Sequence, residues 1–271
     1  MKRSSAISLF YVGIVLYCLV PFLWFVLTSL KTGAQLTAIP PTLIPSFHLG
    51  FYRSALQHYG LLHYVGNSAI VAGLTSLITV TVGSLAAYAI ARFELKWTNF
   101  YLLLLLVVSM FPQIAVAGPV WIILDRLQWL NTYHGLVAAY IALSLPLAIW
   151  ILTTFFREVP REIEEAALTD GCTRTQALYK VVLPLAAPGI LTAGLLVFIH
   201  AWNEFFFALI IMTDPTVQTL PVGIALFPGE YTMPWGEIAA ASTIATIPLV
   251  LLTLIFQRGI VRGLSAGAVK G

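Results

Sequence analysis

Six long apolar segments, separated by short stretches that carry most of the charges, limit what this chain can fold into. The segments span residues 7–30, 64–91, 98–124, 135–156, 185–210 and 238–257. A helix rises ~1.5 Å per residue, so about 20 apolar residues cross a hydrocarbon core of ~30 Å. Charged residues make up only 9% of the chain, against roughly a quarter in soluble domains. The sequence therefore predicts an all-α integral membrane protein with six transmembrane helices in a single domain, 1–271.

This composition excludes a soluble enzyme, a nucleic-acid binder and a secreted disulfide scaffold. Cys18 and Cys172 lie far apart and match no metal-binding or redox spacing. The five histidines show no HExxH or paired-ligand spacing, so we expect no metal site. The first segment follows Lys2 and Arg3, as in a signal peptide. Its apolar run is about twice the usual length, however, and no cleavage site follows it, which favours a retained helix.

The basic residues predict the orientation of the spans, because Lys and Arg are enriched in cytoplasmic loops. With the N-terminus in the cytosol, 11 of the 14 basic residues lie on the cytoplasmic side. The other three are Lys31, Arg53 and Arg126. An even number of spans then places both termini in the cytosol.

The connection over residues 157–184 is the most informative part of the chain. From Arg157 to Lys180 it carries four basic and five acidic residues. Pro160 precedes a predicted short helix that ends near Gly171, because glycine tolerates the left-handed conformation that closes helices. A second helical stretch is expected over residues 173–182. The apolar side of the first helix is expected to consist of Ile163, Ala166, Ala167 and Leu168.

The same connection resembles a known motif. It reads Glu165-Ala166-Ala167, three residues, Gly171, nine residues, and then Val181-Val182-Leu183-Pro184. This is similar to the EAA loop, EAA-x3-G-x9-I-x-LP, of permease subunits in binding-protein-dependent ABC importers. Val181 replaces the isoleucine and keeps the apolar character. The resemblance implies the MetI-like architecture of those permeases, with six transmembrane helices and a cytoplasmic coupling loop.

Further stretches resemble carbohydrate-importer permeases of the maltose and trehalose type. They are Asn67-Ser68, Ala86–Phe93, Trp202–Phe205 and Gly267–Gly271. The resemblance implies a permease subunit that moves a carbohydrate across the membrane, such as trehalose, maltose or a short oligosaccharide. An importer for another polyol, such as glycerol phosphate, is the alternative.

The resemblance also implies a set of partners. They are a second homologous permease, two ATPase subunits, an extracytoplasmic solute-binding protein and the lipid of a prokaryotic cytoplasmic membrane, with no nucleic acid. The sequence contains no GxxxxGK[ST] phosphate-binding loop. We therefore expect that the chain is not an enzyme and holds no cofactor itself, and that ATP and Mg²⁺ bind to the ATPase subunits.

Residues of the EAA loop carry the coupling to the ATPase in the family that the chain resembles. The matching positions here are Glu165, Ala166, Ala167, Gly171, Leu183 and Pro184. We expect Glu165 to pair with a basic group on the ATPase. The two alanines permit close approach, and Gly171 sets the bend between the short helices.

Glu204 is the only Asp, Glu, Lys or Arg in the fifth apolar segment. A charge at membrane depth costs about 2.5–3.5 kcal/mol on insertion scales, so such a residue normally faces a cavity or a partner. Trp202 and Asn203 add an aromatic face and an amide, which suit sugar rings and hydroxyls. We predict that these three residues line the substrate path. The alternatives are that Asn203 and Glu204 hydrogen-bond to a neighbouring helix, or that Glu204 lies at the membrane interface.

A second class of function, a proton-coupled secondary transporter, rests on His200. It lies four residues before Glu204 on the same helical face, where the two side chains would form a proton relay. Such transporters are commonly built from repeated halves, and no second half of this chain repeats the first. Because this function also leaves the EAA loop unexplained, the importer permease is the prediction.

Overall fold

The computed structural model describes residues 2–93, 96–227 and 233–268, and the side chains from residue 10 to 256 within those ranges. The described residues form fourteen α-helices and one π-helix, η1, with no strand. The predicted all-α architecture is therefore confirmed. The C-terminal stretch 267–271, which resembles carbohydrate permeases, lies outside the described side chains.

The chain divides into two compact units. Unit 1 consists of Met1–Val65 and Val222–Pro248, and unit 2 of Gly66–Pro221 and Leu249–Gly271. Among the described helices, three begin in one unit and end in the other. They are α4 (Leu61–Arg92), α13 (Leu220–Ala225) and α14 (Trp235–Ala268).

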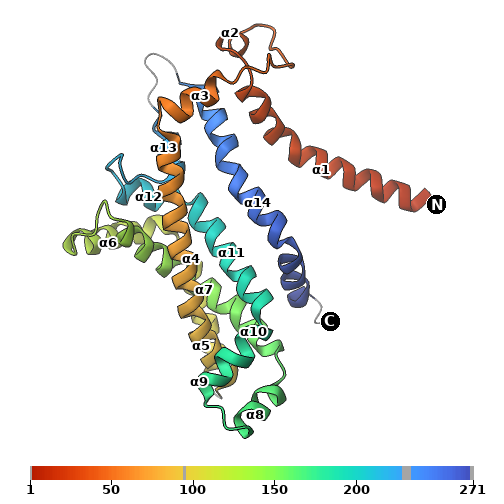
Figure 1. Cartoon of the computed structure of the whole chain (residues 1–271), viewed down its shortest axis with the longest axis vertical. Helices are drawn as coiled ribbons and strands as arrows, with labels where there is room; N and C mark the ends of the chain where they lie inside the picture. Colours follow the sequence, from red (N-terminus) through yellow and green to blue (C-terminus); the bar gives the residue numbers. More distant parts are fainter. Residues whose placement is uncertain (1, 94–95, 228–232, 269–271) are drawn as a thin grey trace. The chain divides into compact units, whose positions relative to one another are not determined.

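Unit 1 begins with α1 (Lys2–Ser29), α2 (Gly33–Leu36) and α3 (Gly50–Gln57). The irregular loop from α1 to α3 folds back on itself, because the His48 N–H donates to the Leu30 carbonyl at 2.9 Å. Inside this loop the Gln35 side chain accepts the N–H groups of Thr32 at 3.2 Å and Ser46 at 3.1 Å. Both ends of the loop therefore lie near the end of α1 (Figure 1).

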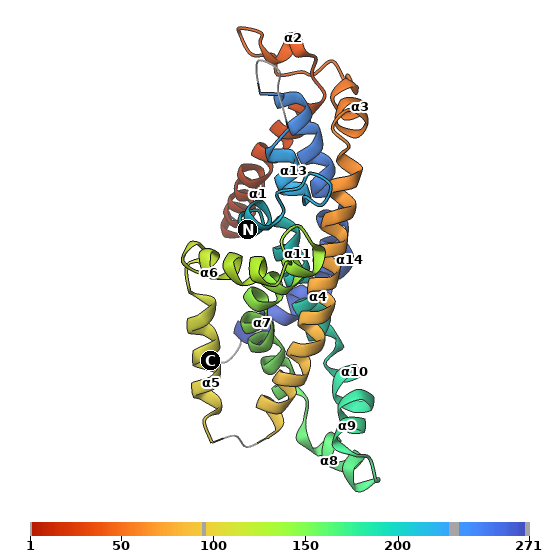
Figure 2. The same ribbon diagram turned by 90° about the vertical axis from the view of Figure 1, so that its left-hand side faces the viewer.

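Unit 2 is built around α7 (Tyr133–Glu158), which packs against α5, α11 and α12. Its buried side chains include Tyr140, Leu152 and Phe156. The short helices α8 and α9 lie at one end of this unit (Figures 1 and 2). The remaining elements are α5 (Thr98–Ser109), α6 (Gln113–Arg126), α8 (Arg161–Thr169), α9 (Arg174–Ala177), η1 (Leu178–Val182), α10 (Leu183–Leu185), α11 (Ala187–Asn203) and α12 (Phe206–Ile211).

Four described helices are long and apolar enough to cross a membrane. They are α1 from Phe10, α4, α7, and α14 up to Phe256. The number rises to six if each of two bent pairs is one span. These pairs are α5 with α6, and Arg174–Leu185 with α11. Each of the six predicted segments overlaps one of these helices or pairs.

The third predicted segment is not one straight helix. The axes of α5 and α6 differ by 90°, and the break lies just before Gln113 (Figure 2). Pro112 accounts for this break, because proline lacks an N–H and disfavours helical backbone at the residue before it. Pro119 and Pro146, by contrast, lie inside continuous helices.

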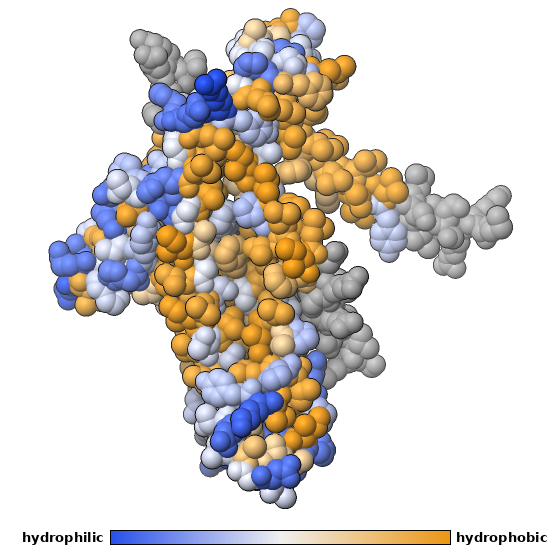
Figure 3. Space-filling view, viewed as in Figure 1, coloured by the Kyte–Doolittle hydropathy of each residue, from blue (hydrophilic) through white to orange (hydrophobic). Residues whose placement is uncertain are grey.

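The surface of unit 2 changes in character along its length. Hydrophilic side chains gather over the end formed by α8 and α9 (Figure 3). Along α4 large apolar side chains are exposed instead, among them Leu74, Leu77, Val82 and Leu85. An exposed apolar face of this kind suits contact with lipid or with other membrane helices.

Candidate functional site

The EAA loop (residues 157–184) begins in the last turn of α7. Val159 is extended, with φ −70° and ψ 121°, as expected for a residue that precedes proline. Pro160 then stands at the N-cap of α8, and Glu162 and Glu164 occupy its first turn, where the helix dipole favours negative charge. The short helix predicted after Pro160 is therefore present as α8.

The end of α8 depends on Gly171, whose φ is +90°. Its N–H donates to the Leu168 carbonyl at 3.1 Å, and the Cys172 N–H donates to the Ala167 carbonyl at 3.0 Å. These two bonds form a Schellman motif, which requires left-handed backbone at the glycine. Gly171 thus ends the first short helix, as predicted.

The second helical stretch begins at Thr173, which forms a capping box with Gln176. It continues as α9 and then widens into η1, where the Leu183 N–H donates to the Leu178 carbonyl. Pro184 explains the change, because it removes the N–H that would bond one α-helical turn back. A bend of 78° follows between this stretch and α11.

Neighbouring acids on α8 face opposite ways. Glu164 is 5% exposed. Glu165 and Ala166 are exposed, and Ala167 is half-buried. The predicted apolar side of α8 is wrong in part, because Ile163 is 44% exposed. Residues three or four apart share a helical face, so the side that packs inward contains Glu164, Ala167 and Leu168.

Glu164 is buried because α4 supplies its partners. Arg92 Nε lies 2.8 Å from Glu164 Oε2, and the Tyr88 hydroxyl donates to Glu164 Oε1. The Arg92 and Glu164 atoms are at ion-pair distance but are not aligned as a hydrogen bond, so their attraction is mainly that of opposite charges. Arg92 Nη2 also donates to the Val159 carbonyl at 2.9 Å. We refer to Tyr88, Arg92 and Glu164 as the α4–α8 clamp.

The sequence prediction missed this clamp. Tyr88 and Arg92 belong to the stretch that resembles carbohydrate permeases, but nothing in that pattern shows what they contact. Their four-residue spacing on one helix was the available signal, since it places a phenol and a guanidinium on one face.

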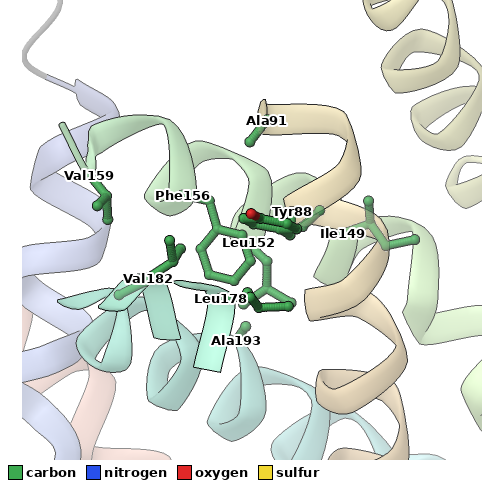
Figure 4. Close-up of a cluster of buried hydrophobic side chains, with 11 residues drawn as sticks. Tyr88, Ala91, Ile149, Leu152, Phe156, Val159, Leu178, Val182 and Ala193 are labelled. Carbon is green, nitrogen blue, oxygen red and sulfur yellow. The ribbon is translucent and has the colours of Figure 1, made fainter. Parts of the chain in front are cut away.

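A buried apolar cluster holds the other end of the EAA loop. Leu178 and Val182 of η1 pack into a cluster that includes Phe156 of α7, Tyr88 of α4 and Ala193 of α11 (Figure 4). Both Phe156 and Val182 are fully buried. The loop is therefore joined to three long helices, through the clamp at α8 and through apolar packing at η1.

Glu204 lies where the fifth segment breaks. Helix α11 ends at Asn203, Glu204 is extended with ψ 128°, and α12 begins at Phe206. The Glu204 carboxylate accepts the N–H groups of Phe207 at 2.9 Å and Ala208 at 3.1 Å, which are free at the start of α12. It also accepts the Tyr140 hydroxyl from α7 at 2.6 Å. This buried carboxylate therefore caps one helix and contacts another.

The other two predicted path residues differ in exposure. Trp202 is 3% exposed and stacks on Phe198 with ring centroids 5.7 Å apart. Asn203 is exposed, and its side-chain amide donates to the Ile199 carbonyl at 2.9 Å. His200 is also exposed and lines an apolar cavity of about 600 Å³.

At the end of α4 away from the EAA loop, polar contacts join it to the segment after α12. Asn67 donates to the Gln218 carbonyl at 2.8 Å and accepts the Tyr133 hydroxyl at 2.7 Å. Ser68 accepts the Leu220 N–H at 2.8 Å.

In the segment after α12, hydrogen bonds from Thr216 lower the pKa of Asp214 below its usual value. The bond from the Thr216 backbone N–H has the largest effect.

Comparison with known proteins identifies the family. Residues 79–266 match the family described as the binding-protein-dependent transport system inner membrane component. The match covers more than half of the chain and includes the EAA loop, Arg92 and Glu204. The chain belongs to this family. It is thus a multi-pass membrane component of a transport system that works with a solute-binding protein and an ATPase, and its own role is that of a permease.

Relatives and a solved structure agree with this assignment. The trehalose/maltose transport system permease protein of Thermococcus litoralis is 45% identical over 94% of this chain and 92% of that protein. The sulfoquinovosyl glycerol transport system permease protein of Agrobacterium fabrum is 44% identical over 93% and 89%. The trehalose transport system permease protein of Mycobacterium tuberculosis is 41% identical over 100% and 99%.

The permease fold is also found in a crystal structure of a bacterial ABC transporter involved in the import of the acidic polysaccharide alginate. One of its chains superposes with a TM-score of 0.81 at 20% identity, over 95% of this chain and 96% of that one. At this identity the likeness shows the fold alone.

Proposed function

We propose that this chain is one of two related permease subunits of an ATP-driven importer for a disaccharide such as trehalose or maltose, or for a short oligosaccharide. Two relatives that are at least 41% identical are named for trehalose, one of them also for maltose, and a third for sulfoquinovosyl glycerol. All three substrates contain a sugar ring, which favours a glycosidic solute over glycerol phosphate.

The observation that carries the proposal is the structure of the EAA loop, which is exposed on one side and bonded to a long helix on the other. Glu165 and Ala166 face outward, while the same short helix is tied to α4 through Glu164. A helix exposed on one side and fixed on the other suits contact with a second protein whose movement must reach the spans. We infer that this second protein is an ATPase subunit, with ATP and Mg²⁺ bound there.

Movement of the EAA loop can reach the spans through two sets of contacts. A shift of α8 pulls on α4 through the clamp, and a shift of η1 presses on the cluster around Phe156. Because buried side chains pack at crystal-like density, small displacements are passed on rather than absorbed. Closure of the ATPase subunits would in this way change the arrangement of α4, α7 and α11.

We further infer that the EAA loop and both termini lie in the cytosol, which the distribution of basic residues supports. The segment that contains Asp214 then lies outside the cell, where the solute-binding protein delivers the sugar. Attachment of a membrane-impermeant maleimide tests this orientation in a chain with Cys18 and Cys172 replaced by serine. We expect a cysteine placed at Asp214 to react in intact cells, and one placed at Glu165 to react only after the membrane is opened.

The substrate path is proposed to pass the break between α11 and α12. Asn203 is exposed at this break, and its amide suits a sugar hydroxyl. Trp202 and Glu204 are buried, so their part in the path is to hold Asn203 and the break in position.

Reconstitution tests the function directly. The permease pair, the ATPase and the binding protein are placed in liposomes, and uptake of labelled trehalose, maltose, sulfoquinovosyl glycerol and glycerol phosphate is measured. We expect uptake of a sugar that requires both internal ATP and the external binding protein. Uptake driven by a pH gradient without ATP would overturn the proposal and support a secondary transporter instead.

A further inference from the structure

Two buried groups of opposite charge connect the EAA loop to a long span. The side chain of Arg92 is 4% exposed and that of Glu164 is 6% exposed, with 2.8 Å between Nε and Oε2. Arg92 is the last residue of α4, and Glu164 lies in the first turn of α8. The two residues are therefore brought together by the tertiary fold and not by local sequence.

Additional bonds restrict how α8 can move relative to α4. Arg92 also donates to the Val159 carbonyl, at the junction of α7 and α8. Tyr88, one turn earlier on α4, donates its hydroxyl to the second oxygen of Glu164. Sliding or rotation of α8 would separate these groups and leave a charge buried without a partner, which is unfavourable. The end of α4 and the start of α8 are thus expected to move as one body.

The far end of α4 is held as well. Asn67 and Ser68, which are 3% and 2% exposed, bond to the segment at Gln218 and Leu220. Between Asn67 and Arg92 the helix is unbroken and spans about 38 Å at ~1.5 Å per residue. Because the helix is continuous and held near both ends, a displacement at Arg92 is expected to reach Asn67.

We propose that Arg92 and Glu164, with Tyr88, are positioning residues that make α4 follow the EAA loop, so that ATPase movement reaches the segment around Gln218. This inference rests on the proposed function. The two adjacent acids then have separate roles. Glu165 meets the ATPase, and Glu164 passes the movement to α4.

The test measures ATP hydrolysed per sugar transported in the complete reconstituted complex. The main variant is the double substitution Arg92→Leu with Glu164→Leu, because replacing a buried ion pair by apolar residues usually preserves stability. We expect the double variant to assemble and to hydrolyse ATP at a rate within about twofold of the parent. The ATP consumed per sugar transported should rise about tenfold, which is the effect of losing a coupling free energy of typical size between two sites. Arg126→Leu, an exposed arginine at the end of α6, is the matched control and should leave the ratio unchanged.

Tyr88→Phe provides a milder variant if the double substitution fails to assemble. It removes one hydroxyl and keeps the ring in the apolar cluster, so we expect the ATP-to-sugar ratio to rise about twofold, the effect of weakening one hydrogen bond. A complex that assembles with either change and keeps the parent ratio would overturn the inference. If the parent complex itself does not couple ATP to sugar uptake, the proposed function fails instead.

Discussion

Two glutamates of this permease, Glu164 and Glu204, are buried to a similar extent but have different structural roles. They are 5% and 7% exposed, and each accepts a tyrosine hydroxyl from another helix. Glu164 has the Arg92 guanidinium at 2.8 Å, whereas Glu204 takes two backbone N–H groups within four residues of itself. One carboxylate joins segments distant in sequence, and the other shapes the chain next to it.

This difference shows that the partner, rather than burial, decides what a buried acid does. A charged partner on another helix resists separation of the two helices, because neither charge is stable alone at low dielectric. Backbone amides of the next helix fix only where that helix starts. The first arrangement suits the transmission of movement, and the second suits a fixed break in a span.

Loss of one clamp charge is expected to have the largest effect on stability. Glu164→Leu leaves Arg92 buried without its partner and should lower the free energy of unfolding by about 3 kcal/mol. Thermal unfolding of the purified complex measures this. The double variant with Arg92→Leu should recover most of the loss, and if it does not, the ion pair is not what stabilises this contact.

Glu204→Ala is expected to have the next largest effect. It removes a helix cap and leaves the Tyr140 hydroxyl unpaired, which together cost about 2 kcal/mol. The ratio of ATP to sugar should stay near that of the parent, unlike that of the clamp variants. Glu204→Gln keeps an acceptor and should lose about half as much. Normal stability with a raised KM for the sugar would instead place the carboxylate in direct contact with the substrate.

A smaller effect is expected at Gly171. Open space surrounds the position of an added Cβ, so Gly171→Ala is penalised only by its φ of +90°, at about 1 kcal/mol. Gly171→Asn should be milder, because asparagine tolerates left-handed backbone. Equal stability of the two variants would mean that the backbone at residue 171 leaves the left-handed conformation. Helical content from circular dichroism would then show whether α8 has changed in length.

The smallest change in stability is expected for Glu165→Ala. This side chain is exposed, so the free energy of unfolding should stay within about 0.5 kcal/mol of the parent. Sugar uptake should nevertheless fall severalfold as contact with the ATPase weakens, a loss typical of one interface ion pair. Glu158→Ala, also exposed, serves as the control and should keep normal uptake. If Glu165→Ala transports normally, the outward role assigned to this acid is wrong.

Much of the EAA loop was predictable because its signals are local. Pro160 and Gly171 mark the ends of α8 through backbone restrictions that act within a few residues. The inward side of α8 was not predictable in the same way. Ile163 is the more apolar residue, yet Glu164 is buried, because the fold brings Arg92 and Tyr88 next to it.

The fifth segment shows the same limit. Its apolar run predicts one continuous span, but Glu204 caps α12 and ends α11. Hydropathy does not reveal this break. A single acid in an apolar segment can either face a cavity or be buried with its oxygens bonded to backbone amides, and the two cases have the same hydropathy.

The sequence by itself determined the membrane setting, the apolar segments, the EAA motif and the permease family, because hydropathy and motif spacing are properties of the chain alone. Only the tertiary structure decided which acid of α8 turns inward, how the break in the fifth segment is held against α7, and which helices the EAA loop is joined to. The physical reason is that these features depend on partners such as Arg92 and Tyr140, which lie more than 60 residues away in the chain and become neighbours only on folding.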